Sequence, residues 1–261
     1  MRLKEKFNQL KKQGRKAFIA YVPFGFPEPK LTKPICLALA KGGVDIIELG
    51  IPFSDPLADG PIIQQATAKA LAAGANLDNF FGTLKELSSS LTIPIVIMTY
   101  YNPVFKYGLE RFLKRLKSHR VCATLIVDLP IEEAGQYLKS ARGLGVDTVF
   151  FVTPTTDQKR MRKIINRSRG FIYYISVTGI TGPKNIAYRS VARQVEFLKK
   201  ISPLPVCVGF GIHSAEQVRA VNEFSDGAIV GSALVEFIDK NYRKKGFLNT
   251  LAAYTSKLCM K

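Results

Sequence analysis

The chain has 261 residues, and its hydrophobic fraction of 47% is enough for a sizeable buried core. No stretch is typical of a membrane span or a signal peptide, and no Ser/Gly-rich linker or short internal repeat divides the chain. We therefore expect one domain over residues 1–261, in a cytoplasmic protein that is not attached to a membrane.

The net charge of +18 raises the question of nucleic-acid binding. The basic stretches, residues 111–120, 159–169 and 240–245, carry apolar residues at helical spacing. This pattern is typical of the solvated faces of amphipathic helices, so no nucleic-acid partner is expected. The charge would also attract an anionic metabolite or the acidic surface of a partner protein.

Cysteines and histidines are too few and too scattered for several kinds of site. The cysteines show no CxxC spacing and have no histidine nearby: Cys36, Cys122, Cys207 and Cys259. This pattern indicates reduced thiols, with neither a metal site nor a disulfide framework. The two histidines, His119 and His213, lie near no Ser or Cys in a nucleophile setting, so a histidine-based triad is not expected.

The first predicted element is an amphipathic helix within Met1–Arg15, with Leu3, Phe7 and Leu10 on one stripe. Eight later runs rich in β-branched or aromatic residues predict buried strands: Ala17–Val22, Val44–Leu49, Ile93–Thr99, Cys122–Asp128, Val146–Val152, Phe171–Ser176, Leu204–Val208 and Gly227–Val230. The helical segments between them are Lys30–Lys41, Ile62–Ala73, Asn79–Ser90, Leu109–Lys117, Glu132–Arg142, Asp157–Ser168, Arg189–Lys200 and Ser214–Asn222.

This alternation predicts an α/β fold, with parallel strands joined by right-handed crossovers. Eight such units in about 260 residues match a closed (β/α)8 TIM barrel with an extra N-terminal helix. The competing fold is a doubly wound open sheet. It is disfavoured because Pro23–Pro27 stands after the first strand, where a dinucleotide-binding fold would carry GxGxxG.

A carboxylate closes the second predicted strand. Alternation places Val44, Ile46 and Glu48 on one face, and if that face points into the barrel, Glu48 lies at its mouth. Catalytic groups of such barrels lie at the C-terminal ends of the strands. The following loop adds Asp55 and Asp59. An unpaired ionised carboxylate is costly to bury, so this position favours chemistry over packing.

Glycine-containing turns follow the last three predicted strands: Thr178–Gly182, Gly209–Gly211 and Gly231–Ser232. Backbone amides approach a phosphate closely where Cβ is absent, and the last turn opens a helix whose dipole favours an anion. Any one of these glycines alone indicates only a turn that needs positive φ. The three together predict a substrate that carries phosphate.

The segment Pro52–Pro61, PFSDPLADGP, is highly specific, and Thr181-Gly182, Gly209–Gly211 and Gly231–Ala233 follow in the expected order. By these motifs the chain resembles the tryptophan synthase alpha chain family, the α subunits, over nearly its whole length. The resemblance implies a retro-aldol cleavage of indole-3-glycerol phosphate to indole and glyceraldehyde 3-phosphate, without a metal or cofactor in this chain. It also implies an α2β2 complex, in which indole passes to a β subunit that carries pyridoxal phosphate.

The same resemblance implies roles for the two carboxylates. Glu48 would be the general acid/base that protonates indole C3, and Asp59 would accept a hydrogen bond from the indole N–H. An apolar barrel mouth would raise the pKa of Glu48, while Asp59 on its loop stays charged. For Asp59, the alternative is a helix-capping residue ahead of Pro61.

Further contacts are implied in the same way. Tyr173 would lie near the glycerol part of the substrate; the alternative is an ordinary aromatic residue that fills the barrel. The indole pocket would be lined by Tyr21, Tyr100, Leu125 and Val127, although core packing explains each of them without a ligand. The phosphate would contact Gly182, Gly211, Gly231 and Ser232. Asp55 and Thr181 would meet when two loops close over the substrate and exclude water; Thr181 would thus also contact the substrate.

Two departures from the family pattern affect this closure. Phe26 stands where an Asp is common and removes a charge near the mouth, and Val177 stands where an Arg is frequent. They predict weakened loop closure and a slow or lost lyase step. The alternative function is therefore an α subunit that mainly activates the β subunit, with Asn102-Pro103 and Asp128–Pro130 as contact surface. A different phosphate-binding barrel would lack the Pro52–Pro61 segment.

Overall fold

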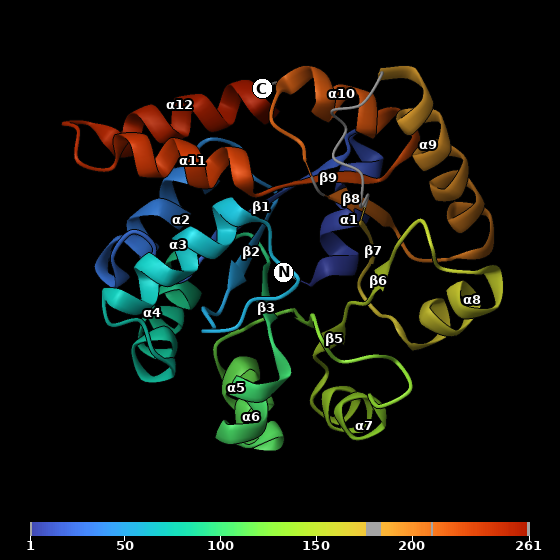
Figure 1. The fold of residues 1–261 in the computed structure, drawn as a ribbon, viewed down its shortest axis with the longest axis horizontal. Helices are drawn as coiled ribbons and strands as arrows, with labels where there is room; N and C mark the ends of the chain where they lie inside the picture. The colour runs from blue at the N-terminus through green and yellow to red at the C-terminus, as the bar shows by residue number, and fades with distance from the viewer. Residues whose placement is uncertain (1, 176–183, 210, 260–261) are drawn as a thin grey trace.

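The strands form one parallel sheet that curls into a barrel (Figure 1). The computed structural model describes residues 2–175, 184–209 and 211–259, without the side chains of residues 184–187. The strand order is β5-β4-β3-β2-β1-β9-β8-β7-β6. The strands are β1 (Ala17–Pro23), β2 (Ile46–Gly50), β3 (Ile95–Thr99), β4 (Ala123–Ile126), β5 (Asp147–Thr148), β6 (Phe151–Val152), β7 (Ile172–Ile175), β8 (Val206–Gly209) and β9 (Gly227–Val230).

The two ends of this order, β5 and β6, are halves of a single interrupted strand. β5 pairs with β4, and β6 pairs with β7. Between the halves, the Val149 N–H donates to the Thr124 carbonyl at 3.0 Å, and the Tyr173 N–H donates to the Phe150 carbonyl at 3.2 Å. The segment therefore bonds to both edges of the sheet and closes it. Counted as one strand, it gives eight, which confirms the predicted (β/α)8 barrel.

Helices surround the barrel in the order that the sequence predicts (Figure 1). They are α1 (Leu3–Lys12), α2 (Thr32–Lys41), α3 (Pro61–Ala72), α4 (Leu77–Ser90), α5 (Tyr101–Tyr107), α6 (Leu109–Ser118), α7 (Gly135–Leu144), α8 (Gln158–Arg167), α9 (Lys184–Ile201), α10 (Ala215–Phe224), α11 (Ser232–Asn241) and α12 (Phe247–Cys259), with a 3-10 turn at Pro29–Leu31. Helices α5 and α12 were not predicted. No helix among the described residues is long and apolar enough to cross a bilayer.

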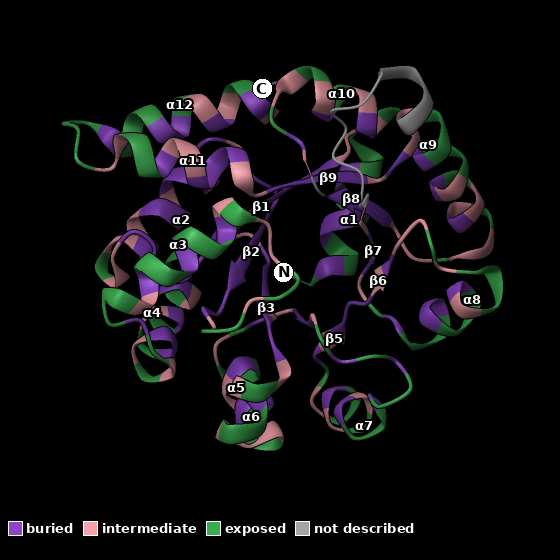
Figure 2. Cartoon of the chain, in the orientation of Figure 1, coloured by how far each residue is buried: buried purple, intermediate pink, exposed green. Residues whose placement is uncertain are grey.

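The buried hydrophobic residues form two clusters. Figure 2 shows that buried residues, in purple, run along the central strands. The larger cluster lies between the strands and the surrounding helices. The smaller fills the barrel interior and includes Ile19, Leu125 and Phe171. The predicted stripe of α1 joins it, because Leu3, Phe7 and Leu10 all belong to this inner cluster. The amphipathic first helix therefore closes one end of the barrel.

Strand β2 shows how alternation divides residues between these cores. Ile46 belongs to the inner cluster, whereas Ile47 and Leu49 belong to the outer one. The prediction that Val44 shares the inner face is wrong, since Val44 packs in the outer core. Val44 lies before β2, which begins at Ile46, so the period of two does not extend back to it.

Candidate functional site

Glu48 is a buried carboxyl group without a hydrogen-bond partner. It lies near the C-terminal end of β2, in register with Tyr21 on β1 and Val96 on β3. Its residue is 1% exposed, and neither carboxyl oxygen has a hydrogen-bond partner within the described part of the chain. Burial raises its pKa to about 8, and the nearby charge of Asp59 adds to the shift. Glu48 is therefore protonated at neutral pH.

Asp59 lies on the loop that follows β2 and is partly buried. Its N–H donates to the Pro56 carbonyl at 3.0 Å, and its own carbonyl accepts from Gln64 Nε2 at 2.9 Å. Burial raises the pKa of its carboxyl to about 6, while hydrogen bonding with the Tyr100 hydroxyl lowers it. The capping alternative is not supported, because Gly60 is the N-cap of α3 and no side chain caps that helix.

The two carboxyl groups differ in charge over a defined pH range. Between about pH 6 and pH 8, Glu48 is protonated and Asp59 is ionised. The difference follows from burial, which is more complete for Glu48, and from the hydroxyl beside Asp59. A pair with separated pKa values can donate a proton at one point and stabilise positive charge at another.

Tyr21 and Tyr173 lie close to Glu48. The pKa of each hydroxyl is raised, mainly by burial and to a smaller extent by the charge of Glu48. Each ring lies over a glycine of the neighbouring strand. A Cβ on Gly209 would stand 2.6 Å from the Tyr173 hydroxyl, and one on Gly50 would collide with the Tyr21 hydroxyl. Any side chain at either glycine would therefore displace a tyrosine from the mouth. The sequence analysis missed Gly50, whose only signal was a glycine that ends a strand.

The other predicted pocket residues divide between the barrel interior and the loop. Leu125 is buried in the inner cluster, and Val127 packs against that cluster together with Tyr173. Tyr100 is buried and contacts the loop after β2 through its hydroxyl. The structure thus brings Tyr21, Tyr173 and Tyr100 into reach of the two carboxyl groups.

The described part of the predicted phosphate site lies at the ends of two adjacent strands. Gly211 follows β8 with φ +72°, and Gly231 follows β9, the neighbour of β8. Gly231 is the N-cap of α11, and Ser232 is its first residue. A helix N-terminus presents free N–H groups and a positive dipole end to an anion. Thr181, Gly182 and Val177 lie outside the described residues.

Two residues that the sequence analysis linked to this site, Asp55 and Phe26, are not in contact with the two carboxyl groups in the described contacts. Asp55 is exposed, and its carboxylate accepts a hydrogen bond from the Ser54 hydroxyl at 2.5 Å. Phe26 is 3% exposed and packs in the outer core. An aspartate at this position would need a partner for its buried charge, and the statement that Phe26 removes a charge near the mouth stays a prediction.

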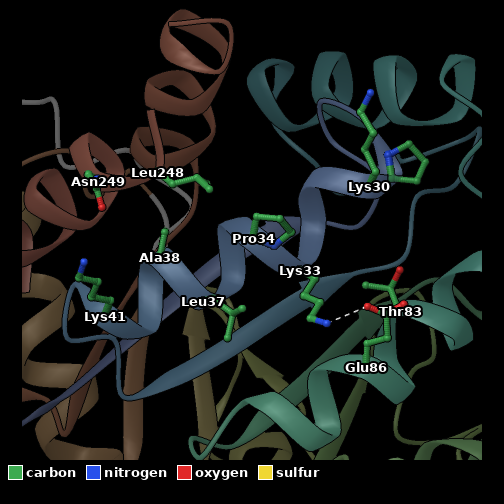
Figure 3. A pocket seen from close by; sticks show the side chains of 11 residues that line it. Lys30, Lys33, Pro34, Leu37, Ala38, Lys41, Thr83, Glu86, Leu248 and Asn249 are labelled. Carbon is green, nitrogen blue, oxygen red and sulfur yellow. Dashed lines mark hydrogen bonds and ion pairs between the residues drawn. The ribbon is translucent and has the colours of Figure 1, made fainter. Parts of the chain in front are cut away.

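A groove of about 660 Å³ lies elsewhere, between α2, α4 and the start of α12 (Figure 3). Its lining includes Leu37 and Leu248 and several lysines, of which Lys33 pairs with Glu86 at 2.9 Å. No residue of the predicted site lines this groove. Among the described residues, no group of three or more His, Cys, Asp or Glu side chains could hold a metal ion.

A closed eight-stranded barrel with a buried acid and an ionised carboxylate at the C-terminal ends of its strands defines a barrel enzyme of acid–base chemistry. The family model for the tryptophan synthase alpha chain matches residues 7–259. The chain belongs to the tryptophan synthase alpha chain family, whose members are carbon-carbon lyases that cleave indole-3-glycerol phosphate.

Individual relatives agree with this assignment. The alpha chain of Carboxydothermus hydrogenoformans is 43% identical over 92% of this chain and 90% of its own length. That of Methanocaldococcus jannaschii is 42% identical over 94% of this chain and 88% of its own. The crystal structure of tryptophan synthase subunit alpha from Legionella pneumophila superposes with a TM-score of 0.91, at 34% identity, over 99% of this chain and 97% of that one.

Proposed function

We propose that this chain carries out the lyase reaction of its family with Glu48 as the proton donor and acceptor and Asp59 as the stabilising anion. The observation that carries the proposal is a protonated, unpartnered Glu48 beside an ionised Asp59 at neutral pH. A buried acid that no protein group satisfies is suited to act on a bound substrate. The substrate is indole-3-glycerol phosphate, and the products are indole and glyceraldehyde 3-phosphate.

The first step transfers the Glu48 proton to C3 of the indole ring. C3 then has four single bonds, and the positive charge is shared with the ring nitrogen. The Asp59 carboxylate accepts a hydrogen bond from that N–H and stabilises the charge as it develops. Asp59 must be ionised for this role, which its pKa of about 6 allows at neutral pH.

The second step breaks the bond between C3 and the glycerol chain. Glu48, now a carboxylate, takes the proton of the hydroxyl on the adjoining carbon, and that carbon becomes an aldehyde. The electron pair of the broken bond returns to the ring, which restores neutral indole with the donated proton on C3. Glu48 ends the cycle protonated, so no metal or external reductant is needed for the balance.

The phosphate end of the substrate is assigned to the rim of β8 and β9. Gly231 and Ser232 would bind it with backbone N–H groups at the start of α11, and Gly211 and Gly182 would also contact it. Tyr173, beside Gly209, would contact the glycerol part. Asp55 and Thr181 would meet when the loops close over the substrate.

The partner that we propose is a tryptophan synthase β subunit that carries pyridoxal phosphate, in an α2β2 complex. Two large apolar side chains stand exposed after neighbouring strands: Leu57, after β2, is 91% exposed, and Phe105 on α5, after β3, is 68% exposed. A contiguous exposed apolar patch is typical of a protein interaction site, and we propose that these two side chains belong to one. Asn102-Pro103 and Asp128–Pro130 would contribute to the same surface.

Glu48→Gln tests the function, because glutamine keeps the shape of the side chain and cannot donate a carboxyl proton. We expect indole release from indole-3-glycerol phosphate to fall about 10³-fold, and about 10²-fold in Asp59→Asn. Glu110→Gln, on the exposed surface of α6, is the matched control and should release indole at the normal rate. Normal release by Glu48→Gln would refute the proposal.

The same assay separates the lyase from a subunit that only activates its partner. Indole release and the stimulation of an added β subunit are measured on the unmodified chain and on Glu48→Gln. If the chain is a lyase, Glu48→Gln loses indole release and still stimulates the β subunit. An unmodified chain that stimulates the β subunit without releasing indole would favour the activator role.

A further inference from the structure

The loop after β2, residues 51–60, carries Asp59 and touches one buried tyrosine at two points. We propose that Tyr100 is a positioning residue, which holds this loop so that the Asp59 carboxylate faces the substrate. The proposal rests on the function proposed above for Asp59. It adds a second role to the expectation that Tyr100 lines the indole pocket.

Tyr100 contacts the loop near both of its ends. Its hydroxyl oxygen accepts the Ala58 N–H at 3.1 Å, one residue before Asp59. Its ring lies against Phe53, with the ring centroids 5.4 Å apart and the planes inclined by 34°. The two contacts are five residues apart along the chain, so one side chain holds the loop near its start and next to its functional residue.

Tyr100 itself is held by the rigid part of the molecule. It is 4% exposed and directly follows β3, which pairs with both β2 and β4. The next N–H, that of Tyr101, donates to Asp128 Oδ1 at 2.6 Å, and α5 begins at this residue. The backbone on either side of Tyr100 is therefore held in place. Through its ring and hydroxyl, Tyr100 in turn holds the loop after β2.

Other contacts hold the backbone of the loop: the Ile51 N–H donates to the Met98 carbonyl at 2.8 Å, and Gln64 Nε2 donates to the Pro56 carbonyl at 3.4 Å. Ser54, Asp55, Leu57 and Ala58 are all exposed. The Leu57 and Asp59 N–H groups donate to carbonyls within the loop, at Asp55 and Pro56. Gln64 on α3 donates to the Asp59 carbonyl and thereby holds the backbone, not the carboxylate. Tyr100 is thus positioned to control where the Asp59 side chain points.

The hydroxyl also has a proton to donate. Because its oxygen accepts the Ala58 N–H, its O–H is free to point to an acceptor, and the Asp59 carboxylate lies beside it. Burial raises the pKa of the Tyr100 hydroxyl, so it stays protonated, and its hydrogen bond lowers the pKa of Asp59. The other titratable groups around Asp59 are Glu48 on β2, Tyr21 on β1 and Tyr173 on β7.

Tyr100→Phe keeps the ring and its contact with Phe53 and removes only the hydroxyl. We expect kcat for indole release to fall about tenfold while KM changes less than threefold, because the substrate still binds and Asp59 is misplaced. The acid limb of kcat/KM should move to higher pH, since Asp59 loses a donor that favours its ionised form. A side chain with only a structural role would not move this limb.

Tyr137→Phe is the matched control. Its hydroxyl is also buried and donates to the Thr124 carbonyl at 3.0 Å, but it lies in the outer core. We expect this variant to lose stability and to keep the acid limb of the unmodified chain. Circular dichroism of both variants would establish that each is folded at the assay temperature.

A double variant distinguishes the failure of this proposal from the failure of the proposed function. If Tyr100 acts through Asp59, adding Tyr100→Phe to Asp59→Asn causes little further loss. A normal rate and acid limb in Tyr100→Phe, with a strong loss in Asp59→Asn, would overturn the positioning role alone. Normal rates in both single variants would overturn the role of Asp59 as well.

Discussion

The two ends of the barrel interior are built from the same strands and serve opposite purposes. At the end that α1 closes, Leu3, Phe7 and Leu10 pack on the inner cluster, and Phe7 lies 6.0 Å from Phe171 between ring centroids. At the other end, Glu48 is buried without a hydrogen-bond partner in the described part of the chain, and Asp59 lies nearby with a raised pKa. The first end is filled by apolar side chains, whereas the second holds the Glu48 carboxyl, which the described residues leave without a partner.

The contrast teaches where the free energy of folding is gained and where it is spent. Apolar burial at the closed end stabilises the barrel by about 25 cal/mol for each Å² removed from water. The carboxyl at the open end weakens the fold whenever it is ionised, because burial disfavours its charge. Because the two ends lie at opposite ends of the strands, the buried carboxyl can destabilise the open end while apolar packing at the closed end keeps the barrel folded.

The largest expected effect concerns stability against pH. The pKa of Glu48 is 4.5 when unfolded and about 8 when folded, so the folded chain binds more protons between these values. The free energy of unfolding should therefore fall as pH rises from 4.5 to 8, by about 1.4 kcal/mol per pH unit from this group, and the slope should end above pH 8. Urea unfolding at several pH values measures it.

Glu48→Gln is the comparison for that slope. The variant has no titrating group at this position, so its stability should depend less on pH than that of the unmodified chain over the same interval. Asp59 titrates in both proteins and does not account for the difference. Parallel stability curves for the two proteins would contradict the raised pKa of Glu48.

The next effect tests the closed end. Leu10 is 2% exposed, and Leu10→Ala should lower the free energy of unfolding by about 3 kcal/mol, because it leaves a cavity where α1 covers the barrel. Below the melting temperature, kcat and both pH limbs should stay unchanged. Lys12→Ala, at an exposed position of the same helix, is the control. A shift of either pH limb in Leu10→Ala would mean that packing at the closed end affects the carboxyl groups at the open end.

The smallest effect sharpens the description of the open end. The rate of indole release should follow a bell-shaped curve with limbs near pH 6 and pH 8, since Asp59 must be ionised and Glu48 protonated. Outside these limits kcat/KM should fall about tenfold per pH unit. Asp59→Asn should lose the acid limb. A profile with one limb in the unmodified chain would exclude the division of roles.

Much of the fold could be predicted from residue patterns. The apolar runs gave strands close to those observed, and Gly227–Val230 matches β9 in full. The boundary at Val44 was wrong because alternation holds only within a paired strand. Helix α12 was not predicted; in the structure it packs on α2, and a Cβ on Gly42, the C-cap of α2, would stand 2.6 Å from the Ala252 carbonyl.

For the candidate site, the sequence alone placed Glu48 at a strand end and Asp59 on the loop beside it, because strand alternation and chain order are local properties. Only the tertiary structure decided that Glu48 has no hydrogen-bond partner within the described residues, that Tyr100 reaches Ala58, and that Phe26 lies in the core. Desolvation and contact depend on groups far apart in the chain, which no single segment contains. The sequence therefore showed which carboxylates lie at this site, but their pKa values depend on burial in the closed barrel.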